Sequence, residues 1–240
     1  MTRTYSEAEI AATIDHAILK PEFTREDVDR ELAVAAEWNV WSVCVRPSDV
    51  AYACERLEAS RVRVGTVIGF PHGTTSTAAK VAEVRRAAED GASEFDMVVN
   101  IGQLRSGTLD DAVREDIAAV VHAAGGAVTK VILETSLLDD EQIARGCRLA
   151  EEAGATFVKT STGFAGGGAT VEHIELMRAT VSEAVQVKAS GGVRGLDAAI
   201  AMLDAGASRL GTSAAATILA EADARAAGAA ASAAEDAGSY

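Results

Sequence analysis

The segments EDGASEF (89–95), EAGATF (152–157) and DAGASRL (204–210) are the strongest indication of the fold, because each joins an alanine-rich stretch to a short apolar run. In each segment a glycine stands between the two parts, where it accepts the left-handed backbone conformation that ends a helix. These glycines are Gly91, Gly154 and Gly206. They lie 63 and 52 residues apart, which is about the length of two strand–helix units. The spacing therefore predicts helices that alternate with parallel strands.

Apolar runs of strand length recur along the rest of the chain, and a helical stretch follows each one. The eight expected strands cover residues 13–17, 40–45, 62–70, 94–100, 130–135, 156–160, 186–189 and 209–211. Capping residues are expected to start several of the helices, at Thr24, Ser48, Ser76 and Thr108. Eight such pairs predict an α/β protein with a single (β/α)8 TIM barrel over residues 1–240. A doubly wound open sheet is the alternative, although no GxGxxG turn follows the first strand.

Composition excludes several classes of partner. The net charge of −14 has no basic patch to offset it, so a nucleic-acid or acidic-membrane surface is not expected. The beginning of the chain has no apolar export segment, and no apolar run reaches the roughly 18 residues of a membrane span. Three cysteines without a CxxC pair indicate reduced thiols. We therefore expect a cytoplasmic protein.

Residues 221–240, rich in alanine, glycine and serine, are expected to form a mobile tail.

Charged residues interrupt five of the expected strands, although strands of a parallel barrel are normally apolar on both faces. The five are Asp15, Asp96, Glu134, Lys159 and Lys188. Burying an unpaired charge costs several kcal/mol, so these groups must pair, shift their pKa or face a site. An interior salt-bridge network would explain any one of them. Two lysines on successive strands, both just before loops at the carboxyl ends of those strands, instead indicate an active site.

The lysine pair points to amine chemistry on a carbonyl compound. Two ammonium groups in a partly dry site repel each other, and the less well solvated one loses its proton more easily. A neutral amine is the nucleophile that attacks an aldehyde or ketone. Asp96 could hold the remaining ammonium and pass protons through water. The four histidines and the scattered acidic residues show no metal-binding spacing, so we expect no metal. His16, beside Asp15, is either a structural group or a residue that lines the site.

The loops after the last two expected strands are rich in glycine. SGGVRG (190–195) and GTS (211–213) each precede a helix. Backbone N–H groups can converge on an anion at such loops, and the loops after the seventh and eighth strands commonly bind phosphate in barrels. The plain alternative is that the glycines only make tight turns.

Seven segments together resemble the deoxyribose-phosphate aldolase family, in family order from about residue 13 to residue 220. They are IDHAILKP (14–21), VIGFPHG (67–73), EFDMVVN (94–100), KVILET (130–135), FVKTSTGF (157–164), VKASGGVR (187–194) and SRLGTS (208–213). The resemblance implies reversible cleavage of 2-deoxy-D-ribose 5-phosphate to D-glyceraldehyde 3-phosphate and acetaldehyde, without a metal or an organic cofactor. It also implies a phosphorylated sugar and acetaldehyde as small-molecule partners, and a homo-oligomer, expected to be a dimer.

The resemblance assigns roles to individual residues. Lys159 matches the lysine that forms the Schiff base, Lys188 the lysine that perturbs it, and Asp96 the aspartate of the proton relay. Phosphate-loop positions match Gly163, Gly191, Gly192, Gly211 and Ser213, and positions that line the pocket match Thr162 and Cys44. Asp15 is an accessory candidate. The terminal Tyr240 is another, because family members often end in a tyrosine that can enter the site.

Two departures stand out: Ala17 where the family commonly has threonine, and Ala214 where a second serine is frequent. Other functions stay open beside the family's reaction. They are a different phosphate-binding class I aldolase or isomerase on the same barrel, and a sugar-phosphate binding protein without activity.

Overall fold

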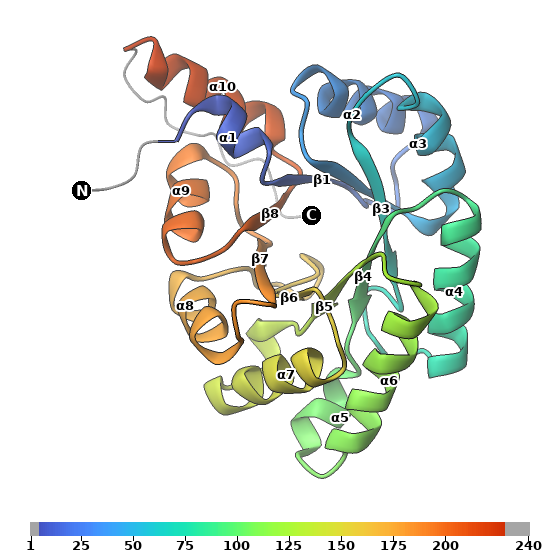
Figure 1. Cartoon of the computed structure of the whole chain (residues 1–240). Helices are drawn as coiled ribbons and strands as arrows, with labels where there is room; N and C mark the ends of the chain where they lie inside the picture. Colours follow the sequence, from blue (N-terminus) through green and yellow to red (C-terminus); the bar gives the residue numbers. More distant parts are fainter. Residues whose placement is uncertain (1–4, 229–240) are drawn as a thin grey trace.

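A closed barrel of eight parallel strands forms the centre of the molecule (Figure 1). The computed structural model describes residues 5–228. The strands pair in the order of the sequence, and β1 pairs with β8, so the predicted (β/α)8 barrel is confirmed and the open sheet is excluded. The strands are β1 (Ile14–Ile18), β2 (Ser42–Val45), β3 (Arg63–Ile68), β4 (Glu94–Val98), β5 (Val128–Ile132), β6 (Phe157–Lys159), β7 (Gln186–Ser190) and β8 (Arg209–Thr212).

Helices surround the barrel and cover the outer face of the strands (Figure 1). They are α1 (Glu7–Ala11), α2 (Arg25–Glu37), α3 (Val50–Arg56), α4 (Thr77–Glu89), α5 (Ile101–Ser106), α6 (Asp110–Ala123), α7 (Asp140–Glu152), α8 (Val171–Thr180), α9 (Leu196–Asp204) and α10 (Ala215–Ala226). Two short 3-10 helices, η1 (Pro47–Asp49) and η2 (Thr135–Leu137), lie in loops after β2 and β5. The sequence did not predict α1 or α5, which are short additions to the repeated strand–helix unit.

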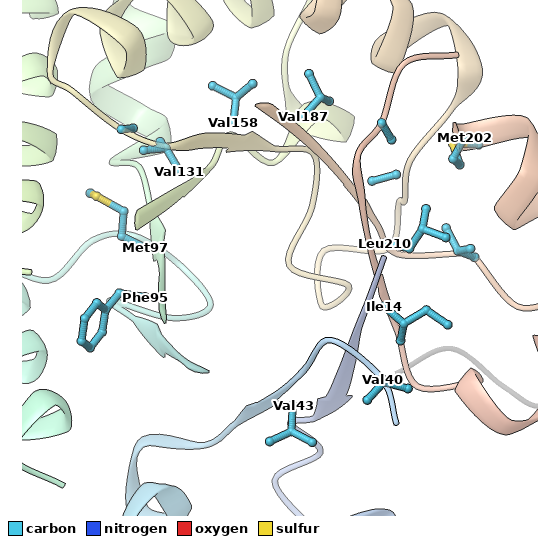
Figure 2. Close-up of a cluster of buried hydrophobic side chains, with 14 of the residues drawn as sticks. Ile14, Val40, Val43, Phe95, Met97, Val131, Val158, Val187, Met202 and Leu210 are labelled. Carbon is cyan, nitrogen blue, oxygen red and sulfur yellow. The ribbon is translucent and has the colours of Figure 1, made fainter. Parts of the chain in front are cut away.

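The main hydrophobic core lies between the barrel and its helices, not inside the barrel. Figure 2 shows Val43, Phe95, Val131 and Val158 pointing outward from the ring of strands, and none of the four is exposed to solvent. Each such buried side chain stabilises the fold by about 1.5–3 kcal/mol relative to an exposed one. The helices thus pack on one face of every strand, and the other face is left to line the barrel interior.

The glycines that predicted the fold lie where expected. Gly91, Gly154 and Gly206 follow the ends of α4, α7 and α9 and have φ angles of 103°, 83° and 111°. These left-handed conformations end each helix and turn the chain into the next strand.

Two of the four predicted capping residues are confirmed. The side chains of Thr24 and Ser76 accept the hydrogen bonds that cap α2 and α4. The prediction is wrong for Ser48, which lies inside η1, and for Thr108, because α6 begins two residues later with Leu109 at its N-cap. In both loops the chain turns once more before the helix starts, so the polar residue falls short of the cap.

The last described helix reaches into the segment that was expected to be a tail. α10 continues to Ala226, and Ala222 is buried. Residues 221–226 are therefore helical, and the terminal Tyr240 lies outside the described residues. No helix within residues 5–228 is both long and apolar enough to cross a membrane. The cysteines are free thiols, as expected.

Candidate active site

Seven charged side chains from six strands meet inside the barrel, and we call them the charge cluster. They are Asp15, Glu94, Asp96, Lys130, Lys159, Lys188 and Arg209, none of them more than 6% exposed. The strand register explains why they meet, since residues paired across neighbouring parallel strands point to the same face. Lys159 pairs with Lys188, Lys188 with Arg209, and Asp96 with Lys130.

Asp96 is the centre of the charge cluster, because its carboxylate contacts three lysines. Its Oδ1 accepts a hydrogen bond from Lys130 Nζ at 2.8 Å. Its Oδ2 accepts from Lys159 Nζ at 2.9 Å and from Lys188 Nζ at 2.8 Å. The predicted trio of Lys159, Lys188 and Asp96 is thus in direct contact, with the aspartate between the two amines.

Asp15 is a second bridge in the charge cluster. It accepts hydrogen bonds from Lys188 Nζ at Oδ2 and from Arg209 at Oδ1, the latter at 2.8 Å. Ser42 also donates to Oδ1, at 2.7 Å. Asp15 therefore contacts the trio through Lys188, and it lies 3.4 Å from Lys130 Nζ.

Glu94 and Arg209 form the part of the charge cluster nearest the amino ends of the strands. Lys130 Nζ lies 2.6 Å from Glu94 Oε2, and Arg209 lies 3.2 Å from the same oxygen. Trp41 donates its indole N–H to Glu94 at 2.9 Å, and its ring stacks on Arg209. The interior charges are therefore partnered on this side as well.

The balance of charge inside the barrel decides which lysine can lose its proton. The charge cluster contains three carboxylates and four basic groups, so it has one excess positive charge when every group is ionised. Burial and the neighbouring Lys188 ammonium lower the pKa of Lys159, although Asp96 acts in the opposite direction. Burial alone would also lower the pKa of Lys188, but the carboxylates of Asp15 and Asp96 outweigh it and raise that pKa. Lys159 is therefore the amine that becomes neutral most easily.

The pKa values of the two aspartates in the charge cluster are lowered by the surrounding cations. Burial alone would raise the pKa of Asp96, but Lys130, Lys159 and Lys188 hold it well below its usual range. Asp15 is likewise held at a low pKa, against its burial, by Lys130, Lys188 and Arg209. Both groups are therefore carboxylates at neutral pH and accept hydrogen bonds from the neighbouring cations.

Sequence reasoning missed three members of the charge cluster and misplaced a neighbouring acid. Glu94, Lys130 and Arg209 each stand first in an expected strand, where a charge would reach solvent. The structure buries all three. Glu134 was expected inside a strand, but it lies two residues beyond β5, at the start of η2, with a φ angle of 61°.

Glu134 and Thr162 join the loops that follow β5 and β6. Thr162 donates its hydroxyl to Glu134 Oε2, and its backbone N–H donates to the same oxygen at 3.2 Å. Burial raises the pKa of Glu134, against the effect of these hydrogen bonds. Thr162 lies three residues after Lys159 and is buried, so the structure brings this predicted site residue to the carboxyl end of the same strand.

The two glycine-rich loops lie side by side. Thr212 donates its hydroxyl to the carbonyl of Val193 at 2.6 Å, which links the loop after β8 to the loop after β7. Gly191 and Gly192 have φ angles of 81° and 78°, and a Cβ at Gly192 would meet no atom within 4 Å. The space beside Gly192 is thus open.

The other predicted phosphate positions differ from one another. Gly163 has a φ angle of 87° in the loop after β6, and Ser213 is exposed between β8 and α10. Gly211 is packed tightly, because a Cβ there would lie 2.8 Å from Ser190 Cβ and 3.0 Å from Lys188 Cε. Its small size therefore leaves room for the Lys188 side chain.

Cys44 on β2 and His16 on β1 point to opposite sides of the barrel wall. Cys44 is buried, its pKa is raised to about 11 by burial, and its thiol and the Lys159 amine affect each other's pKa. Alternation along β2 turns its side chain to the barrel interior, the same side as Ser42. His16 points the other way, toward α2, where its Nε2 lies 2.9 Å from Glu31 Oε2. It does not line the site.

The two departures from the family pattern lie at the carboxyl ends of β1 and β8. Ala17 is 8% exposed, two residues after Asp15 on β1. Ala214 is the N-cap of α10, so this helix has no side-chain cap. In the described part of the chain, no group of three or more His, Cys, Asp or Glu side chains could hold a metal ion.

Comparisons with known proteins point to one family. Residues 10–231 match the family described as DeoC/LacD family aldolase. The chain is 54% identical over 209 residues to a deoxyribose-phosphate aldolase of Staphylococcus haemolyticus, covering 87% of this chain and 94% of that protein. It is 54% identical over 206 residues to deoxyribose-phosphate aldolase 1 of Staphylococcus aureus, covering 86% and 93%.

Solved structures give the same result. The deoxyribose phosphate aldolase of Aeropyrum pernix, a tetramer, superposes with a TM-score of 0.85 at 31% identity, covering 92% of this chain and 93% of that one. The chain is thus similar to these aldolases over most of its length, in sequence and in fold. It belongs to the DeoC/LacD family of aldolases and, within it, groups with the deoxyribose-phosphate aldolases, which are lyases.

Proposed function

We propose that this enzyme reversibly cleaves 2-deoxy-D-ribose 5-phosphate to D-glyceraldehyde 3-phosphate and acetaldehyde, through a Schiff base on Lys159. One observation carries the proposal: Lys159 is the buried amine with a single carboxylate contact, in a cluster where three carboxylates face four basic groups, and its pKa is lowered. A neutral amine at the carboxyl end of a barrel strand is placed to attack an aldehyde.

The reaction begins when Lys159 Nζ adds to the C1 aldehyde of the open-chain sugar. Loss of water from this adduct gives a protonated imine, which withdraws electrons from the neighbouring carbons. The C3 hydroxyl then loses its proton, the C2–C3 bond breaks, and C3 leaves as the aldehyde of glyceraldehyde 3-phosphate. The bonding electrons stay with C2 as an enamine. Protonation of C2 and addition of water release acetaldehyde and restore the amine.

Asp96 and Lys188 are the proposed proton relay. Asp96 contacts both Lys159 and Lys188, so a proton can pass between them or to a bound water without large movements. Lys188 stays cationic because Asp15 and Asp96 both contact it. We assign Asp15 an accessory role, which is to hold Lys188 in place and charged.

The phosphate group is proposed to bind at the joined loops after β7 and β8. Gly192 has open space beside it, and the N-terminus of α10 has no side-chain cap. Backbone N–H groups at such positions attract anions. Gly163, Gly191, Gly211 and Ser213 complete the proposed loop set, and Thr162 and Cys44 line the space near the amine.

Borohydride trapping tests the proposal directly. Incubation with acetaldehyde and borohydride should add one ethyl group to the protein, and peptide mapping should place it on Lys159. The chain has only five lysines, so the map is simple. Lys80 is a built-in control because it is fully buried but paired with Asp116 elsewhere, 2.6 Å away.

Lys159→Ala should abolish both labelling and cleavage. Labelling of Lys188 instead would reverse the assigned roles. Cleavage of a different phosphorylated sugar, with trapping on Lys159 intact, would identify another class I aldolase on the same barrel.

A further inference from the structure

A small apolar surface faces the interior of the barrel on the side of β1, β2 and β3. Its members are Ala17, Leu19, Cys44 and Val67, and Phe70 packs against them. They form a cluster separate from the main core between barrel and helices. We call these four residues the apolar wall.

The strand alternation shows that the apolar wall faces inward. Ala17 lies two residues after Asp15, and Cys44 two residues after Ser42, so each shares the inward face of its predecessor. Val67 pairs in register with Asp96, which belongs to the charge cluster. The barrel interior at this end is therefore charged on one side and apolar on the other.

The apolar wall lies across the barrel from the reactive amine. Cys44 is on β2 and Lys159 on β6, and these strands are four positions apart in a ring of eight. Both side chains are buried and face the same barrel interior from opposite sides. A small molecule bound to Lys159 would thus have the apolar wall in front of it.

The aromatic pair of Phe70 and Phe164 connects the apolar wall to the loop that follows β6, the strand of Lys159. Phe70 follows β3, Phe164 follows β6, and their rings meet edge to face, with centroids 5.3 Å apart and planes at 85°. Such pairs contribute about 0.5–1.5 kcal/mol beyond the burial of their area. The backbone of Phe164 is itself held, because its N–H donates to Thr162 Oγ1 at 3.1 Å. Phe164 therefore braces Phe70 against the apolar wall.

The arrangement limits what can be attached to C2 of a donor bound to Lys159. The charge cluster fills the opposite side, and the proposed phosphate loops lie beyond β7 and β8, where the rest of the sugar must extend. An extra carbon on C2 would therefore meet the apolar wall and Phe70. Acetaldehyde has no such carbon, whereas propanal has one.

We propose that Phe70, braced by Phe164, restricts the donor of this enzyme to the two-carbon aldehyde by closing the apolar wall over C2 of the Lys159-bound donor. The inference rests on the proposed function, because it needs a donor imine on Lys159. Phe70 is a specificity-determining residue in this view, and Phe164 is a positioning residue that acts through it.

The test is a comparison of acetaldehyde and propanal as donors, with glyceraldehyde 3-phosphate as the acceptor. Phe70→Ala should raise the ratio of kcat/KM for propanal to kcat/KM for acetaldehyde at least about tenfold, the usual discrimination for one carbon in an apolar site. Phe164→Ala should raise the ratio less. Phe23→Ala is the matched control, because Phe23 is also half-buried but packs against the main core. Its ratio should equal that of the wild type.

Borohydride trapping with each aldehyde separates the two proposals. If Phe70→Ala unfolds, as judged by circular dichroism, Phe70→Leu replaces it with a smaller loss of packing. Trapping of acetaldehyde on Lys159 combined with an unchanged donor ratio in the folded Phe70 variant would overturn this inference alone. Failure of the wild type to trap acetaldehyde would overturn the proposed function, and this inference with it.

Discussion

Lys159 differs from the two lysines beside it in the number of carboxylates that it contacts. Among the described residues, one carboxylate lies within ion-pair distance of Lys159, two of Lys188 and three of Lys130. All three amines are buried, so desolvation lowers the pKa of each. Only at Lys159 is the carboxylate contact too small to reverse that effect. The nucleophile is thus selected by having the fewest carboxylate partners, together with burial and the neighbouring Lys188 ammonium.

A first prediction concerns this selection. Lys188→Leu removes a cation that lowers the pKa of Lys159. It also removes an amine that competes with Lys159 for the carboxylate of Asp96. Both changes raise the pKa of Lys159, so less of it is neutral at pH 7. Activity at pH 7 should fall about tenfold for each unit by which that pKa rises, and it should recover toward alkaline pH. The measurement is the pH profile of kcat/KM.

Lys80→Met is the control for this prediction. It removes another fully buried lysine, whose partner Asp116 lies outside the charge cluster. The free energy of unfolding should fall, because Asp116 loses its partner, while the pH profile keeps its shape. A Lys188→Leu enzyme with reduced activity and an unshifted profile would show that desolvation alone activates Lys159.

At the scale of single residues, the sequence predicts the chemistry better than the environment that tunes it. An interior salt bridge could explain one lysine in an apolar run, but not two on successive strands, so Lys159 and Lys188 could be found. Lys130 and Arg209 could not, because a charge at the start of a run has an easy alternative in solvent. Only the closed barrel, which brings these strand starts together around Asp15, shows that they are buried.

At the scale of elements, the sequence locates strands and helices but not their exact ends. β5 was expected at 130–135 and is observed at Val128–Ile132. The apolar run continues past the strand into a buried loop, where Leu133 is unexposed and Glu134 adopts a left-handed conformation. Periodicity reports burial, and in this barrel burial extends beyond the hydrogen-bonded part of the strand.

A second prediction concerns the loop after β7. Gly192→Val should raise KM for the phosphorylated sugar, because the new side chain would occupy the open space beside Gly192 where the phosphate is proposed to bind. Unphosphorylated 2-deoxyribose should be a poor substrate of the wild type, mainly through weak binding. The measurement is steady-state kinetics of the wild type and of Gly192→Val on both sugars.

Gly126→Val is a matched control for the strain of this substitution. Gly126 has a φ angle of 93°, and a Cβ there would also meet no atom within 4 Å, but it lies in the turn before β5. Both variants should lose about 1–3 kcal/mol of stability from the strained backbone. Only Gly192→Val should change KM. Equal reaction of the two sugars in the wild type would mean that the glycine-rich loops are ordinary turns.

At the scale of the whole molecule, the interior of the barrel trades stability for reactivity. Most barrels fill this space with layers of branched apolar side chains. Here the charge cluster occupies it, and replacing such buried ion pairs by apolar residues is often neutral or stabilising in other proteins. Stability must then come from the core between the strands and the surrounding helices. The fold could be predicted for that reason, since the outer face follows general rules and the inner face follows the chemistry.

The cost of the charge cluster leads to a last prediction, on acid stability. The pKa values of Asp15 and Asp96 are lowered in the folded protein, so the unfolded chain binds more protons between the folded and unfolded values. Their stabilising contribution is complete above the unfolded pKa of about 4 and is lost as the pH falls toward the folded values. Each group changes the free energy of unfolding by at most about 1.4 kcal/mol per pH unit in this range.

Thermal unfolding from pH 7 to pH 2.5 measures this contribution. The wild-type Tm should fall steeply below about pH 4. Asp15→Asn should start from a lower Tm at neutral pH, because Lys188 and Arg209 lose a partner, and should then fall less steeply, because one titrating group is gone. Asp197→Asn removes a carboxylate that is 81% exposed and should follow the wild-type curve. Parallel acid limbs for the wild type and Asp15→Asn would show that Asp15 is not held ionised by its cations, and the charge balance that lowers the pKa of Lys159 would then have to be revised.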